Sequence, residues 1–373
     1  MVRATVVIPT HAHGPLLRLA AASALAQTVA DLEVFIVLDG ADAATHDAAA
    51  DVANSDHRVR LFPHEKGERH GEAFRHLALQ QAQGRIVCYL SDDDLWFPDH
   101  VEYLEHLLDD ADFAHSLTVV AQPGGRFDIP FLGDLADPWY RDWLVGPHNF
   151  IPLAAAGHTL EAYRSLPVGW SPAPPAVWTD LHMWRKFLAA PGLRLVSGGR
   201  PTLLHFPSPP RRHMDLPARL AEMESWWERL QAPGGWQALR IEANEQLAAR
   251  GGALVRERVQ LEAELGEART RLMTAEQATE SMRSELATRQ TRLAASESEA
   301  DRRTAELAAS ESEANRLTAE LAASESEANR LTAELAAIQG SIAYRASRRL
   351  AGVPVIGRIG RWAARALVGR GAR

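Results

Sequence analysis

Cysteine is almost absent from the 373-residue sequence, and the single thiol, Cys88, lies inside an apolar run. A disulfide within the chain is therefore excluded, and the thiol is most simply a small core residue in a reducing cytosol. No apolar run approaches the roughly 18 residues that a membrane-spanning helix needs. A predicted strand, Arg3 to Ile8, begins almost at the first residue and leaves no room for a signal peptide. We therefore expect a cytoplasmic protein.

An excess of positive charge is also missing, because the net charge is −8. This balance argues against nucleic-acid binding by the protein as a whole, although charge is unevenly distributed along the chain. The 46% hydrophobic and 24% charged residues are ordinary for a folded protein. The length allows two domains, or one domain with an extension.

Residues 1 to about 115 alternate between apolar, β-branched runs and segments with helical spacing. The predicted strands are 5–8, 33–38, 59–62 and 85–90, and the predicted helices are 16–26, 43–53, 71–82 and 98–109. This alternation predicts βαβ units, and hence a mostly parallel sheet covered on both faces. Ligands of such sheets bind beyond the carboxyl ends of the strands.

Polar residues follow three of these strands, as Pro9-Thr10-His11, Asp39-Gly40 and Asp92-Asp93-Asp94. Consecutive carboxylates repel one another. The arrangement becomes favourable when a hard divalent cation bridges the carboxylates to a phosphate. An isolated aspartate run is more often a solvated turn that caps a helix. The convergence of three polar segments on one edge of the sheet favours a binding site instead.

Five short motifs occur in this region in a characteristic order. They are Val6-Val7-Ile8-Pro9-Thr10, Val37-Leu38-Asp39-Gly40, Lys66-Gly67, the helix from Arg75 to Gly84, and Ser91-Asp92-Asp93-Asp94. With them the chain resembles the family-two glycosyltransferases, well over residues 3–115 and more loosely over 145–210. The resemblance implies a GT-A-like α/β sandwich that binds a nucleotide sugar.

The resemblance also implies roles for individual residues. Pro9 and Thr10 would border the nucleotide base, Asp39 would accept a hydrogen bond from the base or ribose, and Asp93 would contact the ribose. Arg75 would steady the nucleotide or the acidic turn, unless it forms a plain surface salt bridge.

A Mg²⁺ or Mn²⁺ ion is the implied cofactor. Asp94 would be its ligand and Asp92 a second or water-mediated contact. His205 is a weaker candidate, because a histidine in such a position is more often a core or rim residue. The family pattern is Asp-x-Asp-Asp, and Ser91 stands at its first position. Which carboxylate reaches the metal therefore stays open.

Asp180 is the candidate general base, because Thr179-Asp180 and the following Trp184 and Arg185 resemble the family's Glu-Asp motif at the head of a helix. Thr179 replaces the glutamate, and a plain helix N-cap is the alternative role of Asp180. The implied activity is inverting, metal-dependent transfer of a sugar, from a donor that we expect to be UDP-linked, to a saccharide or lipid-linked acceptor. The expected context is synthesis of surface polysaccharide or glycolipid.

Two other functions compete with this one. A catalytically inactive scaffold, acting through the C-terminal part of the chain, is compatible with the departures at Ser91 and Thr179. A nucleotidyltransferase would need a glycine-rich phosphate loop near the first strand, where only Gly14 is found.

The chain changes character after the predicted domain of residues 1–235 and a predicted linker, 236–252. Residues 253–340 are rich in helix formers with heptad spacing, and a 14-residue repeat begins at Leu307 and again at Leu321. The pattern predicts a coiled coil that joins copies of the chain. As one helix it would span on the order of 130 Å. A single solvated helix is the rival interpretation, because serine and alanine thin the apolar stripe.

The predicted tail, residues 341–373, contains eight arginines and no acidic residue, interleaved with apolar side chains that include Trp362. A basic amphipathic segment with a tryptophan is typical of membrane-surface binding. RNA or an acidic protein is the alternative partner of the tail. We expect a peripheral protein at the inner face of the plasma membrane.

Overall fold

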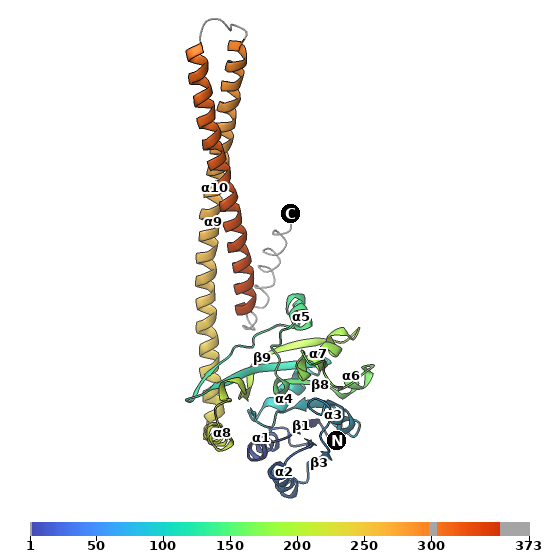
Figure 1. Ribbon diagram of the computed structural model, residues 1–373. Coiled ribbons are helices and arrows are strands. Elements are labelled where there is room, and N and C mark those ends of the chain that lie inside the picture. Colours follow the sequence, from blue (N-terminus) through green and yellow to red (C-terminus); the bar gives the residue numbers. More distant parts are fainter. Residues whose placement is uncertain (1, 298–303, 351–373) are drawn as a thin grey trace. The chain divides into compact units, whose positions relative to one another are not determined.

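The computed structural model describes residues 2–297 and 304–350 (Figure 1). Their contacts form two compact units, one from the start of the chain to Gly251 and one from Gly252 to Arg348. Among the residues described, no helix has both the length and the apolar character that crossing a bilayer requires.

The first unit contains all the strands of the described chain. These are β1 (Ala4–Thr10), β2 (Leu32–Asp39), β3 (Val59–His64), β4 (Ile86–Tyr89), β5 (Leu95–Trp96), β6 (Phe113–Gln122), β7 (Arg126–Asp128), β8 (Ala156–Thr159) and β9 (Leu195–His205). Its helices are α1 (Gly14–Leu25), α2 (Ala43–Ser55), α3 (Glu72–Leu79), α4 (His100–Leu107), α5 (Pro138–Val145), α6 (Leu160–Ser165), α7 (Thr179–Ala189) and α8 (Leu216–Gln231), with short 3₁₀ turns at Leu153–Ala155 and Pro209–Arg211. The eight strands and helices predicted for residues 1–115 are all present, within a few residues of the expected bounds.

The strands form one sheet in the order β3-β2-β1-β4-β8-β6-β9-β5, with β7 beside β6. Pairing is parallel from β3 through β4 and again between β6 and β9. The remaining pairings, β4 with β8, β8 with β6, β9 with β5 and β6 with β7, are antiparallel. The predicted α/β class is confirmed. The sheet is mixed, however, and the predicted parallel pairing dominates only its N-terminal half.

The continuous apolar runs of β1, β2 and β4 are explained by burial on both faces of the sheet. Every residue of β2 and β4 is buried, and Pro9 is the one residue of β1 that is partly accessible. Helices cover parallel strands on both sides, so such strands do not alternate between apolar and polar residues. Cys88 lies in β4 with no exposed surface, as predicted for a core thiol, and burial raises its pKa.

The order of the strands reverses at β1. The chain runs from β1 to β2 and β3 on one side of β1, and then returns to form β4 on its other side. In open α/β sheets, ligands bind at such a reversal, beyond the carboxyl ends of the strands. Thr10 ends β1, Asp39 ends β2, and the three aspartates follow β4.

The predicted linker, residues 236–252, is instead helical. The helix α9 (Gly235–Glu297) begins there, and its first turns belong to the first unit. Leu239, Ala243 and Leu247 are part of the hydrophobic core, and Arg240 forms two hydrogen bonds to Asp99, at 2.7 and 2.5 Å. The apolar residues at helical spacing in this stretch pack on the domain, which is why no linker is needed.

The second unit is a helical hairpin within one chain, whereas the heptads predicted one continuous helix that joins copies of the chain. The helix α9 ends at Glu297, and α10 runs from Thr304 to Leu350 alongside it (Figure 1). The ion pairs Arg271–Glu334, Arg283–Glu325 and Arg289–Glu313 show that the two helices are antiparallel, since the numbers rise on one helix as they fall on the other. The apolar stripe is therefore covered within one chain.

The seam of this hairpin is narrow and partly polar. Leu265, Ala268, Leu317 and Leu331 are buried in it, as is Thr279, whose hydroxyl lies 2.6 Å from that of Ser324. Small and hydroxyl-bearing residues let the helices approach closely, at the cost of apolar area. Of the predicted basic tail, the structure describes only the backbone up to Leu350. Residues 351–373 lie outside the described part.

Candidate functional site

The three aspartates form a tight turn between β4 and β5. The Asp94 backbone N–H donates to the Ser91 carbonyl at 3.2 Å, which closes the turn. The Asp92 and Asp94 residues are 8% and 0% exposed, and the Asp93 side chain is 14% exposed. Three carboxylates are thus held together with little water, an arrangement that needs compensation by other groups.

Asp92 is held by the loop that follows β1. The Thr10 hydroxyl donates to its Oδ2 at 2.6 Å, and His13 Nδ1 lies 3.0 Å from its Oδ1. This hydrogen bond to Asp92 raises the pKa of His13. The predicted residues Thr10 and Asp92 are therefore brought together, and Pro9, paired with Val37 in the sheet, lies beside them.

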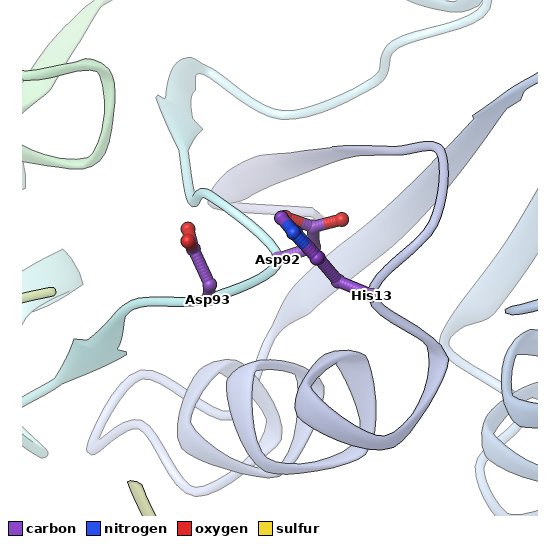
Figure 2. A group of neighbouring side chains, drawn as sticks. All are labelled: His13, Asp92 and Asp93. Atoms are coloured by element: carbon purple, nitrogen blue, oxygen red, sulfur yellow. The ribbon is translucent and has the colours of Figure 1, made fainter. Parts of the chain in front are cut away.

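Asp93 faces a different partner, Arg219 of α8. Arg219 Nη2 donates to Asp93 Oδ2 at 2.7 Å, and Arg219 Nη1 lies 3.1 Å from His13 Nε2. Burial, together with the charges of Asp94 and Asp92, raises the pKa of Asp93 to about 7. Figure 2 shows Asp93 on one side of the turn, with Asp92 and His13 on the other.

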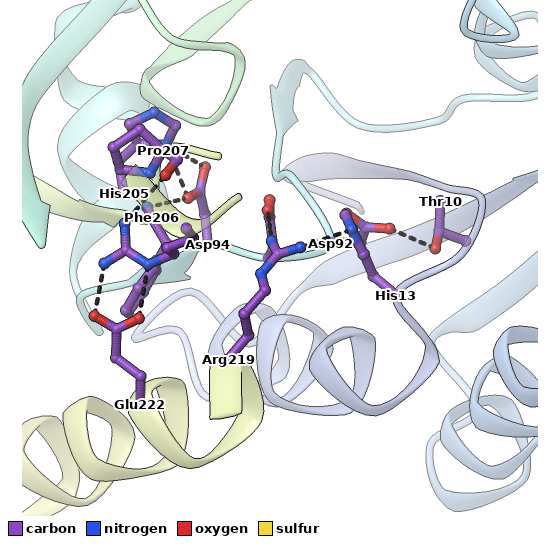
Figure 3. A network of polar contacts seen from close by, with 11 residues as sticks. Thr10, His13, Asp92, Asp94, His205, Phe206, Pro207, Arg219 and Glu222 are labelled. Carbon is purple, nitrogen blue, oxygen red and sulfur yellow. Dashed lines mark hydrogen bonds and ion pairs between the residues drawn. The ribbon is translucent and has the colours of Figure 1, made fainter. Parts of the chain in front are cut away.

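Asp94 is fully buried against the end of β9. Its two oxygens lie 2.9 and 3.0 Å from His205 Nδ1, and its Oδ1 accepts a hydrogen bond from the Phe206 N–H at 2.9 Å. Burial alone would lower the pKa of His205, but the charge and hydrogen bond of Asp94, together with the charges of Asp93 and Asp180, raise that pKa. Two predicted metal contacts, 111 residues apart in sequence, are thus direct neighbours (Figure 3).

The Asp39 carboxylate, at the end of β2, already accepts hydrogen bonds from neighbouring protein groups. Lys66 Nζ donates to its Oδ2 and the Gly67 N–H to its Oδ1, both at 2.6 Å. Gly71 has a φ of 68° and approaches so closely that a Cβ there would lie 2.6 Å from the Asp39 carboxyl carbon. The motifs Asp39-Gly40 and Lys66-Gly67 are therefore in direct contact. A ligand of Asp39 would have to bind the carboxylate alongside Lys66 and Gly67.

Arg75, on α3, is a buried cation rather than a surface one. It is 4% exposed, its guanidinium carbon lies 4.7 Å from the Trp170 ring centroid, and Nη2 donates to the His70 carbonyl at 2.9 Å. Nε and Nη1 have no hydrogen-bond partner among the described residues. Burial lowers the pKa of Arg75, and the charges of Glu72 and, more weakly, Asp180 oppose that shift.

Asp180 lies in the first turn of α7 and is not its N-cap, which is Trp178. Asp180 Oδ1 is 2.7 Å from the N–H of Leu181, and burial raises the pKa of Asp180. The Asp180 charge also contributes to raising the pKa of His205, as it does for Arg75. Asp180 is therefore not the N-cap residue itself, although its carboxylate accepts a hydrogen bond within the first turn of the helix. Its charge acts on both Arg75 and His205.

The donor atoms of the acidic turn suit a divalent cation. In the described part of the chain, His13, Asp92 and Asp93 bring one potential ligand atom each to within 4.8 Å of one another. Asp94 and His205 form a second oxygen–nitrogen pair at 2.9 Å. Carboxylate oxygens with an imidazole nitrogen are suitable ligands for Mn²⁺, and carboxylates alone for Mg²⁺. The predicted set of Asp92, Asp94 and His205 is thus divided between two neighbouring groups.

Sequence reasoning missed two residues of this site, His13 and Arg219. His13 follows β1 on the same edge as Thr10, so its position at a strand end was a usable signal. Arg219 lies in an ordinary helical segment, Leu216 to Gln231, and nothing in the local sequence distinguishes it from other surface arginines. Only the packing of α8 beside the turn brings it to Asp93.

The N-terminal part of the chain is similar to known proteins. Residues 5–146 match the model of Glycosyl transferase family 2. An uncharacterised glycosyltransferase of Rickettsia bellii is 32% identical over 104 residues, which are 28% of this chain and 15% of that protein. The succinoglycan biosynthesis protein ExoW of Rhizobium meliloti is 33% identical over 103 residues, which are 27% of this chain and 32% of that protein. Both matches therefore span less than a third of those proteins.

Solved structures with a related arrangement are more distant. Residues 1–349 of TarS from S. aureus have a TM-score of 0.44 and 14% identity, over 62% of this chain and 69% of that one. The mannosyltransferase PcManGT from Pyrobaculum calidifontis, solved with GDP-Man and Mn²⁺, has a TM-score of 0.41 and 21% identity, over 67% of this chain and 75% of that one. At these scores the likeness supports no statement about ligands.

Proposed function

Proceeding from the Glycosyl transferase family 2 domain at residues 5–146, we propose that the protein is an inverting, metal-dependent glycosyltransferase. It transfers a sugar from a nucleotide-sugar donor, which we expect to be UDP-linked, to an acceptor hydroxyl. The observation that carries this proposal is the contact of Asp94 with His205, 2.9 Å apart beside two further carboxylates. The contact supplies a buried oxygen–nitrogen pair where a donor diphosphate would lie.

The residues of the turn have separate proposed tasks. Asp94 and His205 would hold Mg²⁺ or Mn²⁺, with Asp92 as a second contact, and the cation would neutralise charge on the departing diphosphate. Thr10 and His13 orient Asp92, and Asp93 is directed to the ribose. Asp39 and Pro9 border the nucleotide. Arg75 donates to the ligand through Nε and Nη1, whose lack of acceptors among the described residues supports this role.

Asp180 is the proposed general base. Its carboxylate accepts the proton of the acceptor hydroxyl, and the oxygen then forms a bond to the anomeric carbon from the side opposite the diphosphate. The bond from that carbon to the diphosphate oxygen breaks, and its electron pair stays on the oxygen. Burial raises the pKa of Asp180, which strengthens it as a base near neutral pH.

The product that we propose is a surface polysaccharide or a glycolipid, made from a saccharide or lipid-linked acceptor. The name of one relative, a succinoglycan biosynthesis protein, supports this class. The eight arginines of residues 341–373 would hold the enzyme at the inner face of the plasma membrane. Co-sedimentation of the chain with anionic vesicles tests this location. Equal sedimentation after removal of residues 341–373 would contradict it.

Calorimetry with UDP and Mn²⁺ is the direct test of the donor site. We expect UDP to bind with Mn²⁺ or Mg²⁺ present and much more weakly in EDTA. A thermal-shift screen of nucleotide sugars with the same cations then identifies the donor. The competing function, an inactive scaffold, predicts no metal-dependent heat with any nucleotide, and that result would overturn the proposal.

A further inference from the structure

Arg219 is a charged residue of the site to which the proposed function assigns no task. Figure 3 shows it reaching from α8 to a position between the Asp92–His13 pair and the Asp94–His205 pair. Its guanidinium contacts Asp93 at 2.7 Å and His13 at 3.1 Å, and its side chain is 15% exposed. Arg219 therefore places a full positive charge where the predicted cation and diphosphate would meet.

The stability of α8 does not explain this arginine. Arg219 lies next to the N-terminal end of the helix, where the helix dipole disfavours positive charge. Asp215 already caps that end, because its Oδ1 accepts a hydrogen bond from the Ala218 N–H at 2.9 Å. The position is thus favourable only because of what Arg219 contacts outside the helix.

Docking of α8 does not depend on Arg219 either. Arg211, whose side chain is 1% exposed, forms two hydrogen bonds of 2.7 Å to Glu222 of α8. Arg211 also donates to the Ala121 carbonyl at 3.0 Å, which ties the helix to β6. Met223, Trp226 and Leu230 bury the inner face of α8. With these anchors, Arg219 is free to exchange its partner while the helix stays in place.

The Arg219 guanidinium competes with a cation for the same oxygens. It occupies the group formed by His13, Asp92 and Asp93, so a divalent ion bound there would be repelled by it. Until the guanidinium moves, Asp94 and His205 remain as the ligands of the cation, and Asp92 is added afterwards. A diphosphate bound to that cation would carry negative oxygens toward Arg219, and a planar guanidinium can bind phosphate oxygens through two parallel hydrogen bonds.

We propose that Arg219 is a diphosphate-binding residue that pairs with Asp93 before the donor binds and transfers its guanidinium to the donor diphosphate when the nucleotide sugar binds. This inference rests on the proposed function, because it requires a diphosphate beside the acidic turn. It adds a residue outside the family domain of residues 5–146 to the donor site. It also means that ion pairing between Arg219 and Asp93 weakens cation binding until the donor arrives.

The test is binding of Mn²⁺ alone, and of pyrophosphate with Mn²⁺, by the full chain and its Arg219→Gln variant. Pyrophosphate is used because it represents the diphosphate whatever the base and sugar are. We expect Arg219→Gln to bind Mn²⁺ about threefold more tightly, because a neighbouring positive charge is gone. We expect it to bind pyrophosphate at least about tenfold more weakly, because charged hydrogen bonds are lost. Arg219→Lys keeps the charge but not the planar guanidinium. Its affinity for each probe should lie between those of the wild type and Arg219→Gln.

Arg229→Gln is the matched control, because Arg229 lies near the other end of α8 in a solvent-exposed pair with Glu242. It should behave like the wild type in both measurements. Equal weakening of Mn²⁺ and pyrophosphate binding in Arg219→Gln would indicate a merely structural ion pair and overturn the inference. Pyrophosphate affinity within about twofold of the control would also overturn it. If the wild type bound neither probe, the proposed function would fail together with the inference.

Discussion

At the Asp92–Asp94 turn every carboxylate has a hydrogen-bond partner, whereas the Arg75 guanidinium lacks acceptors for two of its nitrogens among the described residues. Both groups are buried charges in one site. The protein itself compensates the turn, with Thr10, His13, Arg219 and His205 as partners. It leaves Arg75 compensated only in part, by the His70 carbonyl and the Trp170 ring.

The acidic turn is therefore satisfied by protein groups, whereas Arg75 keeps two donors without an acceptor among the described residues. Partners from three distant segments hold the carboxylates of the turn in place before any ligand binds, so no reorganisation is needed later. A buried donor without an acceptor costs free energy, and such groups persist where function uses them. Mutations at the two ends should therefore differ in their effect on stability although both reduce donor binding.

The largest effect is expected from Asp94→Ala. The change removes the acceptor of both the His205 ring and the Phe206 N–H, so unfolding free energy should fall by about 3 kcal/mol. Metal-dependent donor binding should be lost. Urea unfolding and calorimetry with UDP and Mn²⁺ measure the two effects. Asp94→Asn, which keeps an acceptor for Phe206 but no charge, should recover part of the stability and none of the binding.

Asp110→Ala is the control for Asp94→Ala, since Asp110 is exposed and lies outside the site. It should change neither quantity. Donor binding by Asp94→Ala with wild-type metal dependence would show that the turn is not the metal site.

Asp180→Asn should abolish transfer but keep donor binding, with turnover lowered roughly 10²–10⁴-fold. In the wild type only the ionised carboxylate accepts a proton, so kcat/KM should rise as pH increases through the Asp180 pKa. Because burial raises that pKa, the acidic limb should lie above the ordinary aspartate value of about 3.9. Release of nucleoside diphosphate from the donor, followed across pH, measures this.

The exposed Asp142 provides a control of the same chemistry, and Asp142→Asn should retain both turnover and pH profile. Wild-type turnover in Asp180→Asn would remove Asp180 from the mechanism. The base would then have to come from another group.

Arg75→Met tests the difference between the acidic turn and Arg75 most directly. Donor affinity should fall at least about tenfold, because charged hydrogen bonds to the ligand are lost. Unfolding free energy should fall by less than in Asp94→Ala, because the lost cation had unsatisfied donors, although its charge also compensated buried Glu72. Arg60→Met is the control, since Arg60 also lies over aromatic rings, Phe35 and Phe62, but away from the site. A loss of stability as large as that of Asp94→Ala would contradict the proposed contrast.

The smallest effect on the site is expected from changes in the helical hairpin. In Thr279→Cys/Ser324→Cys the hydroxyls now 2.6 Å apart become thiols, which should form a disulfide within one chain under mild oxidation. Donor binding should be unchanged. Buried Cys88, whose pKa is raised, should not compete.

Non-reducing electrophoresis reads out the result, and Thr274→Cys/Ser324→Cys is the control because Thr274 points to solvent. A disulfide between two chains would instead support the homo-oligomeric coiled coil that the heptads predict.

Much of the site was accessible from sequence because strand ends and acidic turns are local features. The alternation of residues 1–115 predicted the first four strands and their helices, and the Asp92–Asp94 turn and Asp180 were identified by their neighbours in sequence. The heptads after residue 252 correctly predicted helix. They could not predict the hairpin. An apolar stripe indicates that one face of a helix is covered, but it does not indicate which helix covers that face.

The order of elements in residues 1–115 and the edge of the sheet where polar groups gather follow from the sequence alone. Only the tertiary structure decided which partner each aspartate has: Asp92 with His13, Asp93 with Arg219, and Asp94 with His205. The last two partners come from segments more than 100 residues away. The physical reason is that buried charges must find compensation wherever packing supplies it, and packing follows the whole fold rather than the local sequence.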